Sequence, residues 1–260
     1  WQIRGPTLAA LGERDDAINA IKRGIKIARS ADPSPNRELA AGISELAATL
    51  ASAGQTGVAM KRYREAMAMW GKLGLEGSHD ALNVNGNLAS MAFRQGRLDE
   101  AESLFQETIE ARQHRYGPSV ALAVLHRDYG LLLLVRHRPD EARDHLERAL
   151  ALSRRFADTR SPEYARTLRA MGVLAISEAH PELALDYLRW AEAVFVEALG
   201  TDHTQTVITR GHRFAALRHI DPAAAAAGFD ETVAAVETAG TGAAPYLADR
   251  LCEQACLHLD

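Results

Sequence analysis

The side chains best suited to metal chemistry lie near the C-terminus. Cys252, Cys256 and His258 form a local group of thiol and imidazole ligands, the types that bind zinc and other soft metals. A helix would place the two sulfurs on one face, because they are four residues apart, but would turn His258 partly away. The remaining histidines are scattered without the spacing of metal ligands. We therefore expect packed thiols here, and no metal or other cofactor.

Acidic residues recur in a pattern that argues against catalysis. Pairs such as Asp99-Glu100 and Asp140-Glu141 recur at the same place in more than one of the repeats described below, where they would begin a helix and favour the positive end of its dipole. A unique active site would not be repeated in this way. The sequence also has no glycine-rich phosphate loop after a strand, no serine elbow and no kinase signature. We expect no enzymatic activity.

The elements that carry these residues come from an internal repeat of 41 or 42 residues. An alanine is followed four residues later by a large residue and seven residues later by a small one. These three positions lie on one stripe of a helix, which indicates close packing against a neighbour. The alanines are Ala17, Ala59, Ala101, Ala142, Ala184 and Ala225; the large residues are Ile21, Tyr63, Phe105, Leu146, Leu188 and Phe229; the small ones are Gly24, Ala66, Thr108, Ala149, Ala191 and Thr232.

A second helix precedes each of these. Twelve residues before the alanine lies another small residue, at Gly5, Ala47, Ala89, Gly130 and Gly172, whereas the sixth copy has Arg213 there. Helix breakers separate the two helices, at Gly12, Gly54, Gly96, Pro139, Pro181 and Pro222. Each copy is therefore predicted to be a helix hairpin, and six hairpins would stack into one continuous core. We expect a single all-α domain over 1–260, with units at about 1–30, 38–74, 80–116, 119–157, 162–199 and 204–238, and a terminal capping helix over 245–258.

Composition supports helices and sets limits on partners. Aromatic residues make up 6% of the chain and the formal net charge is -4, so we expect almost no sheet and no bulk attraction to nucleic acid or anionic membrane. Apolar runs fall short of the length that a membrane span needs. Two cysteines fit a reducing compartment, and we expect a soluble, cytoplasmic protein. Because the repeat is already under way at Trp1, we also expect a fragment of a longer protein.

These columns resemble the tetratricopeptide repeat family, and the resemblance covers nearly the whole chain. The usual repeat has about 34 residues. The longer period, with stretches such as Arg97 to Phe105 and Gly200 to His203, looks like the kinesin-light-chain variety. The resemblance implies a right-handed superhelix whose first helices line a concave groove that binds peptides or partner domains. It also implies a sensor or scaffold part of a larger bacterial signalling or regulatory protein.

The resemblance also identifies candidate groove residues on the first helices. They are Asn83, Asn87, Ser90, Arg94, Arg127, Asp128, Arg166, Arg169 and Arg210. Family members that hold extended peptides use asparagine here, and Asn87 matches that position. Arginines presented together suit carboxylates through paired hydrogen bonds, so we hypothesise an acidic segment or a C-terminal carboxylate as the ligand. The alternative is that these arginines pair with neighbouring acids such as Asp128 and Glu163.

Two other functions stay open at this point. An open repeat end or the alanine run over 223–227 would mediate self-association. A helical repeat that binds RNA would need a basic surface with aromatic side chains on which bases stack. The negative net charge and the few aromatic residues disfavour this function.

Overall fold

The computed structural model describes residues 14–238, and this part of the chain is all helix. It forms eleven helices and contains no strand, which confirms the all-α prediction. None of these helices has both the length and the apolar character to cross a membrane. The first helix expected before residue 14, the terminal helix expected over 245–258, and Cys252, Cys256 and His258 lie outside the described residues. The helices are α2 (Arg14–Ala31), α3 (Arg37–Ser52), α4 (Thr56–Lys72), α5 (His79–Arg94), α6 (Leu98–Tyr116), α7 (Val120–Val135), α8 (Pro139–Phe156), α9 (Pro162–Ser177), α10 (Pro181–Leu199), α11 (Thr204–Leu217) and α12 (Pro222–Thr238).

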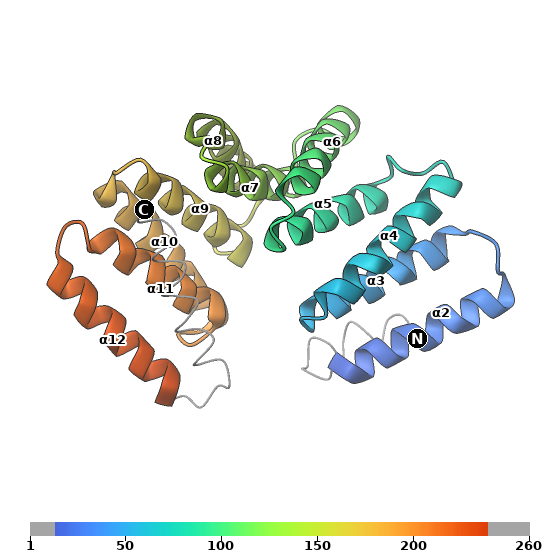
Figure 1. Ribbon diagram of the computed structural model, residues 1–260, viewed down its shortest axis with the longest axis horizontal. Coiled ribbons are helices and arrows are strands. Elements are labelled where there is room, and N and C mark those ends of the chain that lie inside the picture. The colour runs from blue at the N-terminus through green and yellow to red at the C-terminus, as the bar shows by residue number, and fades with distance from the viewer. Residues whose placement is uncertain (1–13, 239–260) are drawn as a thin grey trace. The chain divides into compact units, whose positions relative to one another are not determined.

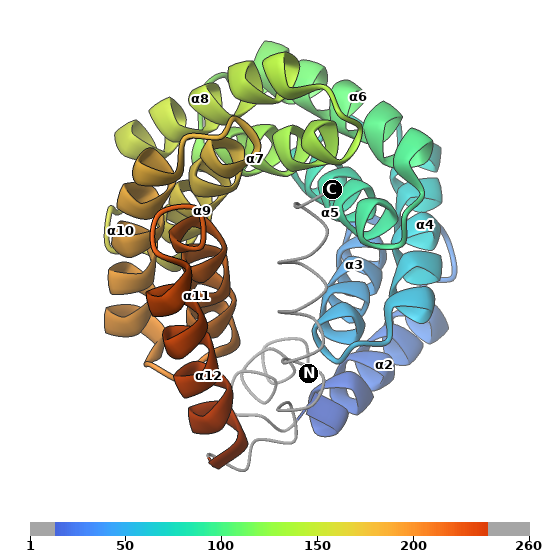
Figure 2. The same cartoon turned by 60° about the vertical axis from the view of Figure 1, so that its left-hand side comes forward.

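The chain divides into two compact units, with the boundary between Gly117 and Pro118. In the first unit each of the helices α2 to α6 lies against the next one in the chain (Figure 1). The second unit continues in the same way from α7 to α12, and α9 also contacts both α7 and α11. Figure 2 shows the layers of this unit, with α7 and α9 on one side and α8 and α10 on the other. The first helices of the second unit thus form one continuous surface.

Local capping and turn residues set the ends of the described helices. Four first helices, α3, α5, α7 and α9, start at an Asn or Ser side chain that accepts a hydrogen bond from the third backbone N–H of the helix, at Asn36, Ser78, Ser119 and Ser161. The turn into the second helix contains a left-handed residue in four hairpins, which is Gly54 in the second hairpin and Gly96 in the third. In the next two hairpins His137 and Ala179 take this conformation, with φ of 56° and 57°. A proline two residues later then opens the second helix.

The predicted columns form the core. The described alanines of the first column are buried, five of them completely, and each of the large residues from Ile21 to Leu188 is at most 2% exposed. The small column on the first helix lies against that large residue. A Cβ on Gly130 would come within 2.7 Å of Leu146, and one on Gly172 within 2.6 Å of Leu188. The glycines therefore allow first and second helices to approach closely.

The sixth hairpin reverses this arrangement. Its first helix, α11, has Arg213 at the position of the small residue, and the neighbouring Phe214 is 7% exposed. The small residue is instead Gly228 on α12, where a Cβ would lie 2.4 Å from the Phe214 ring. The large side chain thus comes from the first helix and the small one from the second, which explains the break in the sequence pattern.

Candidate functional site

Two asparagines give α5 a polar face in the first unit. Asn83 and Asn87 are exposed and one helical turn apart. The Oδ1 atom of Asn83 accepts a hydrogen bond of 2.8 Å from Arg112, and the Nδ2 group of Asn87 donates one of 3.0 Å to the hydroxyl of Tyr63. The Nδ2 group of Asn83 also lies 3.2 Å from Nδ1 of His79, so both polar atoms of this amide have partners. The Oδ1 atom of Asn87 has no hydrogen-bond partner among residues 14–238 and can accept from the N–H of a peptide unit.

Arg112 is a contributor to this face that the sequence analysis missed. It lies on α6, is 1% exposed, and its Nε atom is buried without a hydrogen-bond partner among the described residues. Burial lowers its pKa from the ordinary arginine value. The repeat does hold a signal, because the position eleven residues after the column alanine is Trp70, Ser153 or Phe195 in other hairpins, all buried. A charged residue in that column has to find a polar partner, which is Asn83.

The other two candidates on α5 lie further along the helix. Ser90 is half-buried and Arg94, in the last turn, is exposed. The first unit therefore carries four of the predicted residues on one helix, with the two amides oriented by residues of α4 and α6.

In the second unit the predicted residues Arg127 and Asp128 form an ion-paired cluster with Glu163. The guanidinium of Arg127, on α7, donates to Asp128 from Nε at 2.9 Å and to Glu163 on α9 from Nη1. Its side chain is 9% exposed. Burial alone would lower the pKa of Arg127, but Asp128 and Glu163 raise it above the ordinary value. This pairing is the alternative that the sequence left open, and it removes Arg127 as a freely presented cation.

Arg166 shares the same acid. It lies one turn after Glu163 on α9 and binds the second oxygen of that carboxylate. Burial would raise the pKa of Glu163, but Arg127 and Arg166 lower it below the usual range. Glu163 is therefore ionised at neutral pH and links α7 to α9.

Arg169 differs from its two neighbours. Its guanidinium lies 5.6 Å from the centre of the Phe195 ring and makes long hydrogen bonds, of 3.5 and 3.4 Å, to the backbone oxygen of Gln205 and the hydroxyl of Thr209 on α11. No ion pair joins it to an acid within residues 14–238. Its pKa is lowered to about 10, first by burial and then by Arg127 and Arg166. The cluster has three arginines and two carboxylates, and the excess positive charge is at Arg169.

Arg210 pairs with a different acid from those that bind the arginines of α7 and α9. It forms a 2.8 Å ion pair with Glu192 on α10, and Glu192 also binds Arg213. The surface that the first helices offer to an anion is therefore built on α7 and α9, with Gln205 and Thr209 of α11 at its edge.

This arrangement is suited to binding. Among residues 14–238, no group of three or more His, Cys, Asp or Glu side chains is placed to hold a metal ion. A half-buried arginine without a carboxylate partner can take one from outside, with two hydrogen bonds in a planar geometry. The candidate binding surfaces are thus a polar face on α5, which carries two side-chain amides, and a cationic face on α7, α9 and α11.

Comparison with known proteins gives a consistent picture of the fold. The model of the tetratricopeptide repeat family matches residues 80–134 and 120–195. No curated protein sequence matches the chain. Among solved structures, BtubC (BKLC) from P. vanneervenii has a TM-score of 0.68 at 20% identity and covers 88% of this chain and 92% of its own.

Two further structures share the fold at lower identity. A putative kinesin light chain of Podosopora anserina with nearly identical TPR-like repeats has a TM-score of 0.58 at 15% identity, over 74% of this chain and 92% of its own. A Rap protein complexed with competence and sporulation factor has a TM-score of 0.71 at 12% identity, over 99% of this chain and 75% of its own. Residues 80–195 thus match the predicted tetratricopeptide repeat family, and the fold of the chain is shared with solved repeat structures, a kinesin-light-chain-like one among them.

Proposed function

We propose that this chain, which has the tetratricopeptide repeat fold and matches that family over residues 80–195, is a non-catalytic interaction module that binds an acidic segment of a partner protein on α7, α9 and α11. The observation that carries the proposal is Arg169, a half-buried cation with no ion-pair partner among the described residues. The Rap protein, which has this fold, is complexed with competence and sporulation factor, and this supports a binding role for the fold. The module would act as a sensor or scaffold part of a regulatory protein.

Charge at Arg169 favours an anion for two reasons. The pKa of Arg169 is lowered first by burial, and next by Arg127 and Arg166, which add to the positive potential there. A carboxylate that binds Arg169 gives this guanidinium the counter-charge that Asp128 and Glu163 already supply to the other two arginines. A carboxylate from a side chain or from a C-terminus would fit equally, since both present the same two oxygens.

The test uses a change that removes charge but keeps a polar side chain. The chain and its Arg169→Gln variant are used to capture partners from the lysate of the source organism, and the affinity of each captured protein is then measured with purified components. We expect at least one partner to bind Arg169→Gln about tenfold more weakly, in line with the loss of a charge-assisted hydrogen bond. Deletion of the acidic segment from that partner should weaken its binding to the wild-type chain by a similar factor.

A matched control comes from the same unit. Arg154 on the second helix α8 is exposed and has no ion pair to another described residue, so Arg154→Gln changes the net charge equally. Partners that bind wild type, Arg169→Gln and Arg154→Gln with the same affinity would reject the cationic face as the binding site. Equal losses in both variants would show a general charge effect and would also reject it.

A further inference from the structure

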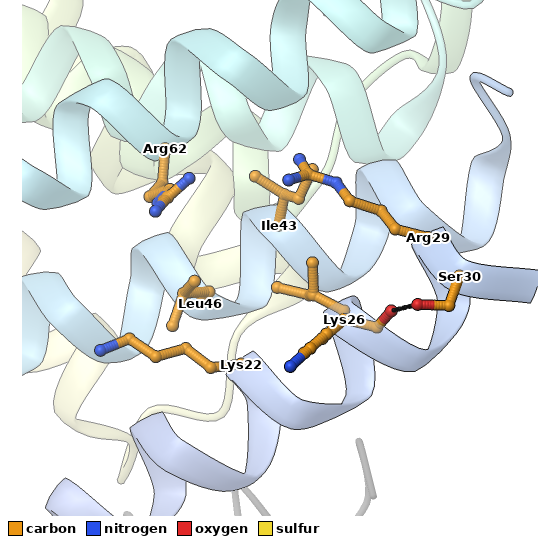
Figure 3. Close-up of a pocket in the computed structure, with 8 residues that line it drawn as sticks. Lys22, Lys26, Arg29, Ser30, Ile43, Leu46 and Arg62 are labelled. Atoms are coloured by element: carbon orange, nitrogen blue, oxygen red, sulfur yellow. Dashed lines mark hydrogen bonds between the residues drawn. The ribbon is translucent and has the colours of Figure 1, made fainter. Parts of the chain in front are cut away.

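A second basic site lies in the first unit, on the helices α2, α3 and α4. A hollow of about 310 Å³ opens between α2 and α4 over the side of α3 (Figure 3). Its rim carries four cations, Lys22, Lys26 and Arg29 from α2 and Arg62 from α4. The three residues of α2 are spaced by four and three, so they share one face of that helix. The volume is at the lower end of the range for small-molecule sites.

The floor of this hollow is apolar. Ile25 of α2 and Ile43 and Leu46 of α3 line it, and each is at most 9% exposed. Figure 3 shows Ile43 and Leu46 between Arg62 and the lysines of α2. An apolar floor with a charged rim suits a ligand that has a small apolar body and an anionic head.

The rim has more positive charge than its neighbours neutralise. Glu65 on α4 binds both Arg29 and Arg62, the latter at 2.7 Å, and these arginines hold its pKa below the usual range against the effect of burial. Lys22 and Lys26 form no ion pair with any residue in 14–238. Four cations therefore face one carboxylate, in a protein whose net charge is -4.

The repeat explains why the hollow occurs in this hairpin. The position three residues after the column alanine is Arg62 here, and Leu104, His145 or Tyr187 in the next three hairpins. Those three side chains are half-buried and apolar or aromatic. Arg62 instead extends to Glu65, so its charged end lies at the rim while the floor is left to Ile43 and Leu46.

We propose that this pocket binds a small organic phosphate, a phosphate monoester on a compact apolar or aromatic group. A monoester carries a charge of about -1.5 to -2 at neutral pH and offers three acceptor oxygens, which match the excess charge of the rim better than a single carboxylate does. The two lysines would bind it as mobile point charges, and the arginines, held in place by Glu65, would add fixed donors. The apolar group would lie on Ile43 and Leu46.

Phenyl phosphate is the probe that tests this site, by isothermal titration of the 260-residue chain. We expect saturable binding that is about tenfold weaker in a Lys22→Gln, Lys26→Gln variant, as the loss of two exposed charge contacts implies. Both lysines are exposed, so the variant keeps its fold, which far-UV circular dichroism would verify. Lys61→Gln, an exposed change on α4 that does not line the pocket, should bind like the wild type.

Further probes show whether the phosphate or the apolar group is recognised, and whether the ligand is a small molecule or a lipid headgroup. Inorganic phosphate should bind more weakly than phenyl phosphate, and benzyl alcohol should not bind detectably. Absence of saturable phenyl phosphate binding, or equal weakening in Lys61→Gln, would overturn the proposal. Inorganic phosphate binding as tightly as phenyl phosphate would refute the role of the apolar floor. Binding to anionic phospholipid vesicles without binding to phenyl phosphate would replace the small molecule by a lipid surface.

Discussion

Adding one methyl group at Gly172 should destabilise the second unit. A Cβ there would lie 2.6 Å from Cγ and 2.8 Å from Cδ2 of Leu188. Carbon atoms are at their best separation near 3.5 to 4.0 Å, so the two helices would have to move apart by about 1 Å or Leu188 would have to change rotamer. Leu188 is 0% exposed, so any new rotamer has to be packed within the core. Gly172→Ala therefore forces the packing of α9 on α10 to change.

Two opposing effects set the size of the loss. Overpacking of a core costs about 1 to 3 kcal/mol, while Ala in place of Gly within a helix gains about 1 kcal/mol. The net effect is a loss of about 1 kcal/mol in the free energy of unfolding. For a chain of this size that corresponds to a fall in Tm of about 2 to 4 °C. Urea unfolding followed by circular dichroism, with differential scanning calorimetry, measures both quantities.

A compensating change comes from another hairpin. The same two positions are occupied by Ala89 and Phe105 in the third hairpin, where both are completely buried. A flat ring can lie beside a methyl group at a place where the branched Cγ of leucine cannot. Gly172→Ala combined with Leu188→Phe should therefore be more stable than the sum of the two single changes, by at least about 0.5 kcal/mol. An increase in Tm for Gly172→Ala, or strict additivity in this cycle, would refute the close-approach argument.

Three further changes probe other parts of the structure. The pKa of His126 is lowered to about 4, chiefly by burial, so between pH 6.5 and 4 the unfolded chain binds a proton that the folded chain does not. As the pH falls through this range, the free energy of unfolding should decrease by up to about 3 kcal/mol relative to a His126→Gln variant. A difference between the two proteins that does not change with pH would contradict this. Glu163→Gln removes one of the two counter-charges of the buried Arg127 and should cost about 1 to 2 kcal/mol in urea unfolding, with no loss expected if the ion pair were solvated. Ala179→Gly removes a left-handed residue with a side chain and should raise the free energy of unfolding by about 1 kcal/mol. Gly96→Ala, at the matching turn of the third hairpin, should lower it by a similar amount. Tm values equal to that of the wild type in both variants would show that the turn carries no strain.

The hairpins were predictable from the sequence because packing positions repeat. Small and large residues return every 41 or 42 positions, and a residue type that fills space against a neighbour has to occupy the same place in each copy. The turns were predictable for a related reason, although two of them are made by His137 and Ala179 instead of glycine. There, residues that do not favour the left-handed conformation occupy the turn position that glycine takes in the other hairpins.

The site was less predictable because pairing depends on side-chain direction. Arg127, Arg166 and Arg169 were all assigned to one surface, and the sequence contained Asp128 and Glu163 as partners. It did not show that both acids would go to Arg127 and Arg166 and leave Arg169. Arg210 was misleading for a similar reason, since its partner Glu192 lies on the second helix of the preceding hairpin.

The distribution of charge around Arg169 also determines how binding should respond to conditions. Arg169 is protonated at neutral pH even with its pKa lowered to about 10, and an acidic ligand is ionised above pH 6, so affinity should be constant between pH 6 and 8. Salt should weaken it, because the attraction includes Arg127 and Arg166 and acts over several ångströms, a range that ions screen. The measurement is the dissociation constant of the captured partner at 0.05 and 0.5 M NaCl, with Arg169→Gln beside wild type. A smaller salt dependence in the variant supports a charge-based contact at this residue. An equal dependence in both proteins would mean that the ligand binds elsewhere, since removing the central cation of the face has to remove its share of the screened attraction.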